Sequence, residues 1–535
     1  MLTSALRLPS AMGRTALVLC LAGGLSLGHM AQAQEFPAFR QALAETISAN
    51  EGASAFYRDT GYEPLWTGAD SAPQREALIT ALSRAGEHGL PAERYDVDGL
   101  IAGFNAVESE RDRGELEAQV TKVFLQYARD LHSGVLNPRQ IDSSIVRQLP
   151  RPNPETLLRD FAEAPAASFL RGLAPRAPEY ARLFRARNDL VRVIEQGGWG
   201  APVPQTRFTP GTSGEGVVAL RNRLIAMGYL ERSASAEYDA ALQGAVMEFQ
   251  KTHGLEQDGI AGEATIRALN VSAEDRLKSV IVAMERERWL NIPRGDRHIW
   301  VNLTDFTSQI VDDDEVTFET VSVIGARASD RQTPEFSDEM SYLEVNPDWT
   351  VPRSIIARSY WNALASGGAR QFQIVDAAGR VVPREAIDFS RYTPANFPFN
   401  VRQPPGPSNA LGEVKFMFPN PYAIYLHDSP ERHLFNRTVR TYSSGCVRLQ
   451  DPREFAYELL SRQSDDPQAK YHRVLNTRQL TRIYLDEKVP VHLVYRTAFT
   501  DVRGALNFRD DIYGRDARIY DALLRAGAVA DGLQS

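Results

Sequence analysis

The chain has 535 residues, of which 43% are hydrophobic and 24% charged. This ordinary globular balance excludes disordered, collagen-like and multi-span membrane classes and predicts roughly three or four domains. The 60 basic and 68 acidic residues give a formal net charge of −8, so the chain lacks the basic footprint of a nucleic-acid binder. Only two cysteines are present, which excludes a disulfide-stapled secreted fold.

Residues 1–33 are predicted to be a cleaved export signal. Arg7 and Arg14 precede an apolar run at residues 17–27, and an Ala-Gln-Ala cleavage pattern follows this run. The run is too short to remain as a membrane anchor, and no later segment predicts a membrane span. Cleavage would leave Cys446 as the single cysteine of a soluble protein in the periplasm.

Residues 34–200 are predicted to form a helical scaffold domain. Apolar side chains recur with helical spacing from Val120 to Leu131 and again from Leu183 to Ile194. A proline-rich stretch before residue 211 then predicts a linker.

Residues 211–271 are predicted to form a compact module of three helices, because apolar stripes with helical spacing are separated by glycine-containing turns. The order of residues in this segment resembles the small peptidoglycan-binding domain that accompanies many cell-wall enzymes. Whether this copy binds glycan or serves as a spacer stays open. The residues that carry the resemblance are Leu220, Gly228-Tyr229, Tyr238-Asp239, Ala245-Val246, Phe249-Gln250, Gly254-Leu255, Asp258-Gly259, Gly262, Thr265 and Leu269-Asn270.

Residues 276–500 are predicted to form a mainly-β domain. Alternating apolar residues at 299–303 and an acidic turn at 312–314 indicate a hairpin. The turn lacks the glycine and the terminal glutamate of an EF-hand loop, so it does not indicate calcium. A segment with helical character at residues 353–400 is predicted to be a capping insertion, and residues 501–535 a C-terminal helical tail. The predicted fold class is therefore multidomain α+β.

Cys446 lies in the polar segment Ser-Ser-Gly-Cys-Val-Arg, although a lone cysteine is more often a small buried hydrophobe than a nucleophile. Gly445 permits a tight turn and a close approach of substrate. Arg448 favours the thiolate, which is the reactive form. Asp451, a proline and Glu454 then predict a capped helix start, which places the cysteine on a short loop before a helix.

His427 is the predicted base, because a nucleophilic cysteine needs one within hydrogen-bond reach. In an extended strand Tyr425 and His427 share a face, so a phenol is expected beside the imidazole. A structural histidine is the alternative interpretation. The histidines lack the spacing of metal ligands, so no metal is expected. Rival bases on composition alone are His433, His472 and His492.

The order His…Ser-x-Gly-Cys-x-Arg resembles the L,D-transpeptidase catalytic domain, whose members crosslink peptidoglycan through a cysteine. The whole chain is similar to the large periplasmic members, with a helical scaffold, a peptidoglycan-binding module and a catalytic domain that carries a capping subdomain. Many relatives have histidine at the position of Ser444, which leaves His427 as the sole base here. Further matches are Thr333-Pro334, Asn346-Pro347, Trp349, Pro352, Pro405-Gly406, Asn409, Leu411-Gly412 and Lys415-Phe416.

The resemblance implies acyl transfer without a cofactor. Cys446 attacks the third residue of a stem tetrapeptide, meso-diaminopimelate, and releases D-alanine; an amine of a neighbouring stem then forms a 3→3 crosslink. The backbone N–H groups of Gly445 and Cys446 and the Tyr425 hydroxyl are the expected oxyanion donors, in a loop that also contains Ser444. Arg448 is expected either to hold a substrate carboxylate or to clamp the loop. The implied partners are peptidoglycan stem peptides and glycan.

Three alternatives stay open. With water as the acceptor the enzyme is an L,D-carboxypeptidase, and with a protein lysine it anchors an outer-membrane protein to the wall. The third alternative is a wall-binding scaffold without activity. This alternative is disfavoured by the joint presence of His427, Gly445, Cys446 and Arg448. A papain-like peptidase places its cysteine before its histidine, the reverse of the order in this chain. The oligomeric state is not predicted.

Overall fold

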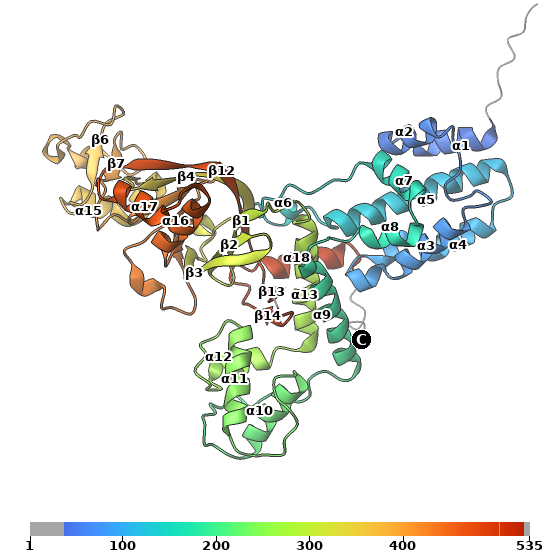
Figure 1. The fold of residues 1–535 in the computed structure, drawn as a ribbon, viewed down its shortest axis with the longest axis horizontal. Coiled ribbons are helices and arrows are strands. Elements are labelled where there is room, and N and C mark those ends of the chain that lie inside the picture. Colours follow the sequence, from blue (N-terminus) through green and yellow to red (C-terminus); the bar gives the residue numbers. More distant parts are fainter. Residues whose placement is uncertain (1–36, 502, 529–535) are drawn as a thin grey trace, which may run out of the picture.

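The computed structural model describes residues 37–501 and 503–528. The predicted export signal, with Cys20, lies outside these residues. The molecule is elongated, with a helical body at one end, a β-rich body at the other and a small helical body that projects between them (Figure 1). Within the described residues, none of the helices has both the length and the apolar character needed to cross a membrane.

The N-terminal body is helical, as predicted, and its core contains Trp66, Phe124 and Phe161 in mutual ring contact. Its longest helix, α5, begins at a capping box in which Ser109 and Asp112 satisfy each other's backbone N–H groups. The helices are α1 (Ala38–Ile47), α2 (Glu51–Asp59), α3 (Ala72–Ser83), α4 (Val97–Asn105), α5 (Glu110–Ser133), α6 (Pro138–Ile141), α7 (Pro154–Glu163), α8 (Ala166–Gly172) and α9 (Pro178–Glu195).

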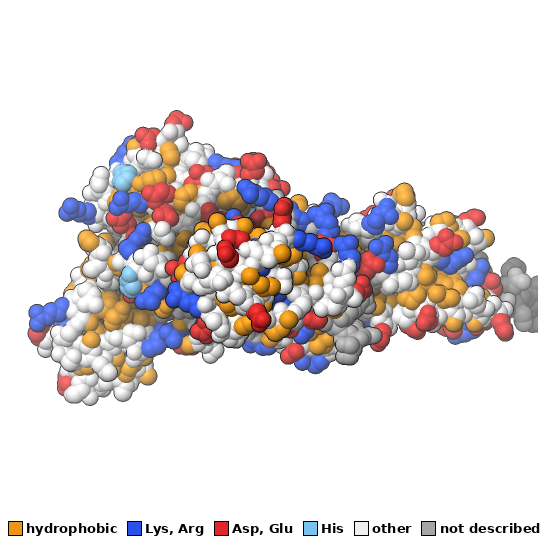
Figure 2. Space-filling model, turned by 90° about the horizontal axis from the view of Figure 1, so that it is seen from below, with side chains coloured by type: hydrophobic (Ala, Val, Ile, Leu, Met, Phe, Trp, Pro, Cys, Tyr) orange, Lys and Arg blue, Asp and Glu red, His pale blue; other side chains and the backbone are white. Residues whose placement is uncertain are grey.

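The small body is the predicted three-helix module, formed by α10 (Glu215–Ala226), α11 (Ala240–Thr252) and α12 (Glu263–Leu269). It has a separate apolar core in which Leu220, Leu242 and Phe249 are completely buried. Figure 2 views the molecule from the side of this module and shows acidic and basic side chains interspersed over the surface.

The β-rich body contains a nine-stranded sheet with the strand order β10-β3-β11-β9-β8-β4-β12-β1-β2, and an additional β2–β3 pairing curls it round. The acidic turn expected at residues 312–314 joins β2 to β3 with positive φ at Asp313 and Asp314, so the hairpin is confirmed. Helices α16 (Pro452–Leu460) and α17 (Pro467–Leu475) belong to the same body. The strands are β1 (Arg297–Asn302), β2 (Thr307–Asp312), β3 (Glu315–Gly325), β4 (Phe336–Val345), β8 (Val414–Met417), β9 (Leu426–His427), β10 (Thr441–Ser443), β11 (Val447–Leu449) and β12 (Thr481–Val494).

Between β4 and β8 the chain forms a separate small core around Trp349, Phe372 and Phe397, and Tyr425 of the β-rich body packs against it. This segment contains the whole of the predicted capping insertion, residues 353–400, and extends beyond it on both sides. Its elements are β5 (Trp349–Thr350), α14 (Arg353–Ile355), a π-helical turn (Ile356–Tyr360), α15 (Trp361–Ala365), β6 (Gln373–Val375) and β7 (Asn400–Gln403).

Three further elements join the helical body to the sheet. Helix α13 (Ala273–Trp289) and helix α18 (Arg515–Arg525) both contribute to the helical core, although α13 lies mostly within the segment assigned from sequence to the β domain. A hairpin of β13 (Ala498–Thr500) and β14 (Leu506–Phe508) also packs against the helical core. The segment predicted as a helical tail therefore contains a strand, β14, as well as a helix.

A buried ionic network fixes this junction. Arg286 of α13 contacts Glu335 at 2.6 Å and Asp516 of α18 at 2.9 Å, and Arg515 contacts the other oxygen of Glu335 at 3.0 Å. Arg515 also donates to the backbone carbonyl of Thr333 at 2.9 Å. The network therefore links the helical body to a segment that approaches the cysteine loop.

Removing the central carboxylate is expected to destabilise the protein strongly. Glu335→Ala leaves two buried guanidinium groups without their shared partner, which costs about 3–5 kcal/mol of unfolding free energy. The matched control is Glu339→Ala, four residues further along, because Glu339 forms an exposed pair with Lys488 and such pairs contribute about 0–1 kcal/mol. Urea unfolding followed by circular dichroism measures both, and equal midpoints for the two variants would contradict the expectation.

Candidate active site

The register of three neighbouring strands gathers the predicted site residues. His427 on β9 lies opposite Lys415 on the antiparallel strand β8 and opposite Arg448 on the parallel strand β11. Because side chains alternate along a strand, the neighbours Phe416, Leu426 and Val447 point the other way, into the apolar core. The polar residues are thus held on one face by a sheet whose opposite face is packed.

The loop that carries Cys446 is fixed by two hydroxyl groups. Ser443 Oγ donates to the Cys446 carbonyl at 2.5 Å and accepts from the Gly445 N–H at 3.1 Å. The buried Thr333 Oγ1 donates to the Gly445 carbonyl at 2.7 Å. Gly445 has φ of +128°, a conformation that side chains rarely adopt. The turn predicted at Gly445 is therefore present and held from both sides.

Gly445→Ala is expected to reduce acylation of Cys446 by roughly 10–100-fold, a barrier increase of about 1.4–2.7 kcal/mol, while the protein stays folded. An added Cβ meets Ile424 Cδ1 at 3.2 Å and is strained by the positive φ, so the loop must shift. Mass spectrometry of carbapenem labelling over time measures the rate. Gly172→Ala is the control, because no atom lies within 4 Å of a Cβ added there.

The Cys446 side chain is half-buried. Its thiol donates to the Ala423 carbonyl at 3.6 Å. Burial raises the pKa of the thiol, whereas hydrogen bonds from the backbone and the hydroxyl of Tyr425 and the charges of Lys415 and Arg448 act to lower it. The net pKa is raised, so the thiol is protonated at neutral pH and needs a base to become a nucleophile.

Tyr425 contacts both residues of the predicted pair. The charge of Cys446 acts on its hydroxyl, and its ring lies edge-on to the His427 ring at a centroid distance of 5.6 Å. Lys415 Nζ lies 4.2 Å from the centroid of the Tyr425 ring, and Tyr425 packs against the small core that contains Trp349. Burial, followed by the charge of Cys446, raises the pKa of Tyr425 well above its usual value. The hydroxyl therefore stays protonated and able to donate.

His427 is buried and oriented by the backbone. Its Nδ1 lies 2.5 Å from the carbonyl oxygen of Asp428, so Nδ1 carries the proton and Nε2 is left as the acceptor. Burial, then Arg448 and Lys415, lowers the pKa of His427 to about 3. The imidazole is accordingly neutral at physiological pH, as a general base must be.

The Asp428 carboxylate stabilises the connection between β8 and β9. It accepts from the backbone N–H groups of Glu413 at 2.9 Å and of Ser429 at 2.6 Å. It also fills the space beside Gly412, where a Cβ would lie 2.1 Å from its oxygen. The carboxylate thus holds the β8–β9 connection, while the backbone carbonyl of the same residue orients His427.

Arg448 is engaged by a residue that the sequence did not single out. Its guanidinium pairs with Glu431. This pairing is compatible with the loop clamp, one of the two roles predicted for Arg448; both stay predictions. Ser444 is exposed and accepts a hydrogen bond at 3.0 Å from Arg358 of the insertion, which also pairs with Asp330 at 3.1 Å.

The structure adds residues to the predicted set. Thr333, Trp349 and Lys415 lie in motifs that were recognised in the sequence, but only the fold shows that they contact the cysteine loop or Tyr425. Glu431 and Arg358 carried no signal in the sequence. The rival histidines lie elsewhere: His472 bonds to Tyr457, His492 bonds to Ser337, and His433 is exposed.

One local prediction was wrong. Helix α16 begins at Pro452 as expected, but Asp451 does not cap it through its side chain. Asp451 Oδ2 instead accepts from Thr320 Oγ1 of β3 at 2.8 Å. A tertiary contact has outcompeted the local cap. Among the described residues, no cluster of three or more potential metal-binding side chains is present.

Comparison with known families identifies three segments. Residues 296–470 match the model of the L,D-transpeptidase catalytic domain, which includes every site residue described above. The chain contains an L,D-transpeptidase catalytic domain. Residues 213–269 match a domain described as "Putative peptidoglycan binding domain", and residues 51–186 match a scaffold domain. The family resemblance and the fold class predicted from the sequence are therefore confirmed.

One curated relative agrees with this assignment. The chain is 33% identical over 257 residues to a "Putative L,D-transpeptidase" of Haemophilus influenzae, a match that covers 47% of this chain and 51% of that protein. The match thus spans about half the length of the curated relative. Crystal structures of L,D-transpeptidases from Xylanimonas cellulosilytica and Stackebrandtia nassauensis align over 55% of this chain and 100% and 97% of theirs. Their sequence identities to this chain are 17% and 14%, and the TM-scores are 0.17 and 0.21.

Proposed function

We propose that this protein is a peptidoglycan L,D-transpeptidase that forms 3→3 crosslinks through a Cys446 thioester. One observation supports this most directly: in an L,D-transpeptidase catalytic domain, a half-buried thiol shares Tyr425 as a neighbour with a neutral, backbone-oriented histidine. The substrate is a stem tetrapeptide, in keeping with a segment that matches a peptidoglycan-binding domain. No cofactor takes part in the proposed steps.

In the first step His427 Nε2 takes the thiol proton, and Cys446 Sγ attacks the carbonyl of the third residue. The C–S bond forms, the amide C–N bond breaks, and D-alanine leaves with the proton held by His427. In the second step an amine of a neighbouring stem attacks the thioester. The new C–N bond forms, the C–S bond breaks, and the amine proton passes through His427 to the thiolate.

The tetrahedral intermediate in each step carries an oxyanion that needs fixed donors. The Gly445 N–H is already engaged by Ser443 Oγ at 3.1 Å. The Cys446 N–H and the Tyr425 hydroxyl are therefore the proposed donors, each worth about 3 kcal/mol in the transition state. Arg448, paired with Glu431, supports the loop.

The proposed site of action is outside the cytoplasm, where peptidoglycan lies, after removal of residues 1–33. Hydrolysis and protein anchoring share the acyl-enzyme and differ only in the acceptor. We favour transpeptidation because the segment that contains Cys446 matches the model of the L,D-transpeptidase catalytic domain.

Incubation of the mature protein with disaccharide-tetrapeptide and mass analysis of the products tests the proposal. A crosslinked dimer with loss of one D-alanine is the expected product. A tripeptide product alone would replace transpeptidation by L,D-carboxypeptidase activity. Unchanged substrate, with a folded protein, would overturn the catalytic proposal and leave a wall-binding scaffold.

A further inference from the structure

A cavity of about 600 Å³ lies where the three-helix module meets the helical body, away from Cys446. Its walls come from α9 and the segment after it, from the C-terminal ends of α10 and α11, from α13 and from the β13–β14 hairpin. Its volume is within the range of about 300–1,000 Å³ that small-ligand sites occupy. None of the proposed catalytic steps uses this cavity.

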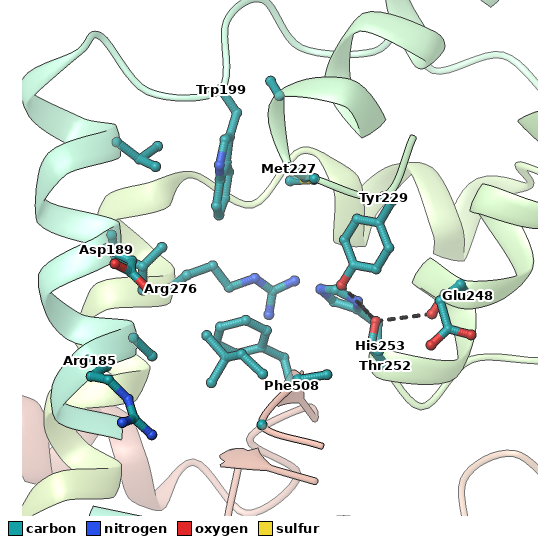
Figure 3. Close-up of a pocket in the computed structure, with 18 of the residues that line it drawn as sticks. Arg185, Asp189, Trp199, Met227, Tyr229, Glu248, Thr252, His253, Arg276 and Phe508 are labelled. Carbon is teal, nitrogen blue, oxygen red and sulfur yellow. Dashed lines mark hydrogen bonds between the residues drawn. The ribbon is translucent and has the colours of Figure 1, made fainter. Parts of the chain in front are cut away.

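A guanidinium group projects into the middle of the cavity. Arg276 extends from α13 toward Tyr229 and His253 of the module (Figure 3). It donates to the Ala268 carbonyl at 3.1 Å and lies 4.3 Å from the centroid of the Phe508 ring. Its Nε is buried without a hydrogen-bond partner, and none of the described carboxylates pairs with the group.

The remaining charges leave the cavity net positive. Its two carboxylates are engaged at the rim, Asp189 by Arg192 and Glu248 by Lys251 at 3.7 Å. Arg185 lines the cavity and is exposed, and it too lacks an ion-pair partner among the described residues. Burial, followed by the charge of Arg276, lowers the pKa of His253 well below its usual value, so this ring adds no charge.

The half-buried Arg276 has no ion-pair partner among the described residues, and its planar set of donors matches a carboxylate. Aromatic walls stand beside it. Trp199 points into the cavity from one side, and Tyr229, whose hydroxyl bonds to Thr252 at 2.7 Å, lies on another (Figure 3). Such rings offer flat apolar surfaces that suit the C–H faces of a sugar.

We propose that this cavity binds a muropeptide, with a sugar against Trp199 and Tyr229 and a stem-peptide carboxylate on Arg276. The ligand class rests on the proposed function, since peptidoglycan offers amino sugars and carboxylates in one molecule. Because the module and the helical body each contribute walls, bound ligand fixes their relative position. The cavity is then a second point of attachment to the wall, separate from the cysteine loop.

The test uses the full mature chain with Cys446→Ala, so that the probe is not consumed. Disaccharide-tetrapeptide is titrated by calorimetry, and hydrogen exchange with mass spectrometry locates the binding. The expected result is slower exchange at residues 226–229 and 504–508. Arg276→Gln and Trp199→Ala should each weaken this binding at least tenfold, whereas Arg171→Gln, which removes an exposed charge on α8, should leave it unchanged.

Arg276→Gln removes an internal contact, so its fold is checked by its unfolding midpoint. Should it not fold, Arg185→Gln, which changes an exposed side chain, should weaken binding, and Trp199→Phe should weaken it less than Trp199→Ala. A neutral probe, chitotetraose, should bind at least tenfold more weakly and should not respond to Arg276→Gln.

Exchange slowed only at residues 441–448, or equal affinity in all variants, would overturn the cavity proposal. Carbapenem labelling of Cys446 in the unsubstituted chain separates the two proposals. Labelling without binding at the cavity would leave the proposed function standing, and binding at the cavity without labelling would leave only the cavity.

Discussion

Cys446→Ala is expected to abolish every product from disaccharide-tetrapeptide, a loss of at least about 10³-fold. The thiol is the proposed nucleophile, and each of the possible acceptors, whether amine, water or protein lysine, needs the acyl intermediate first. Mass spectrometry of the reaction measures crosslinked dimer, tripeptide and released D-alanine together. The same variant should gain no mass on treatment with a carbapenem.

The sequence supplies a matched control for this experiment. The chain has two cysteines, and the other, Cys20, lies in the predicted export signal. In the full-length protein, before residues 1–33 are removed, Cys20→Ala should therefore leave turnover and labelling at the level of the unsubstituted protein. Product formed at an undiminished rate by Cys446→Ala would refute a covalent mechanism, because no second thiol is left in the mature chain.

His427→Ala is expected to lower the rate of Cys446 acylation by about 10²–10⁴-fold, the range that general-base catalysis supplies. Burial holds the pKa of the thiol above its usual value, so little thiolate forms without the imidazole. The exposed His433 provides the control, and His433→Ala should keep the full rate. A comparable loss in both variants would show that His427 acts through stability rather than through proton transfer.

The pH dependence follows from the same pKa shifts. His427, with its pKa lowered to about 3, is neutral throughout the physiological range, so no acidic limb is expected near pH 6.5. The thiol, with its pKa raised, loses its proton as the pH rises. Alkylation of Cys446 by iodoacetamide should therefore accelerate from neutral into alkaline pH. A plateau that already begins near pH 6 would indicate a thiolate–imidazolium pair and contradict this assignment.

Much of the organisation was predictable because it depends on local patterns. The apolar spacing from Val120 to Leu131 predicted α5, and the acidic triplet predicted the turn between β2 and β3, where Asp313 and Asp314 have positive φ. Both features depend on residues close together in the chain. The capping of α16 was equally local but was wrong, because Thr320 from β3 binds the Asp451 side chain instead.

The boundary between helical body and β domain could not be read from the sequence. Helix α13 stands directly before the first strand of the sheet. Its position in the chain is therefore compatible with membership of either the helical body or the β-rich body. The tertiary contacts of α13 assign it to the helical body. Leu277 and Trp289 pack in the helical core, and Arg286 forms an ion pair with α18, which lies more than two hundred residues later in the chain. No periodicity along the chain records such contacts.

The sequence by itself determined the chemical inventory: a cysteine in a glycine-containing polar loop, a histidine upstream, and the order of motifs that marks the catalytic domain. Only the tertiary structure decided how that inventory is used. Strand register places Lys415 and Arg448 on either side of His427, and the fold brings Thr333 to the Gly445 carbonyl at 2.7 Å. These contacts join residues far apart in the chain, and they exist only once the sheet has formed, because register, burial and electrostatics are properties of packed strands.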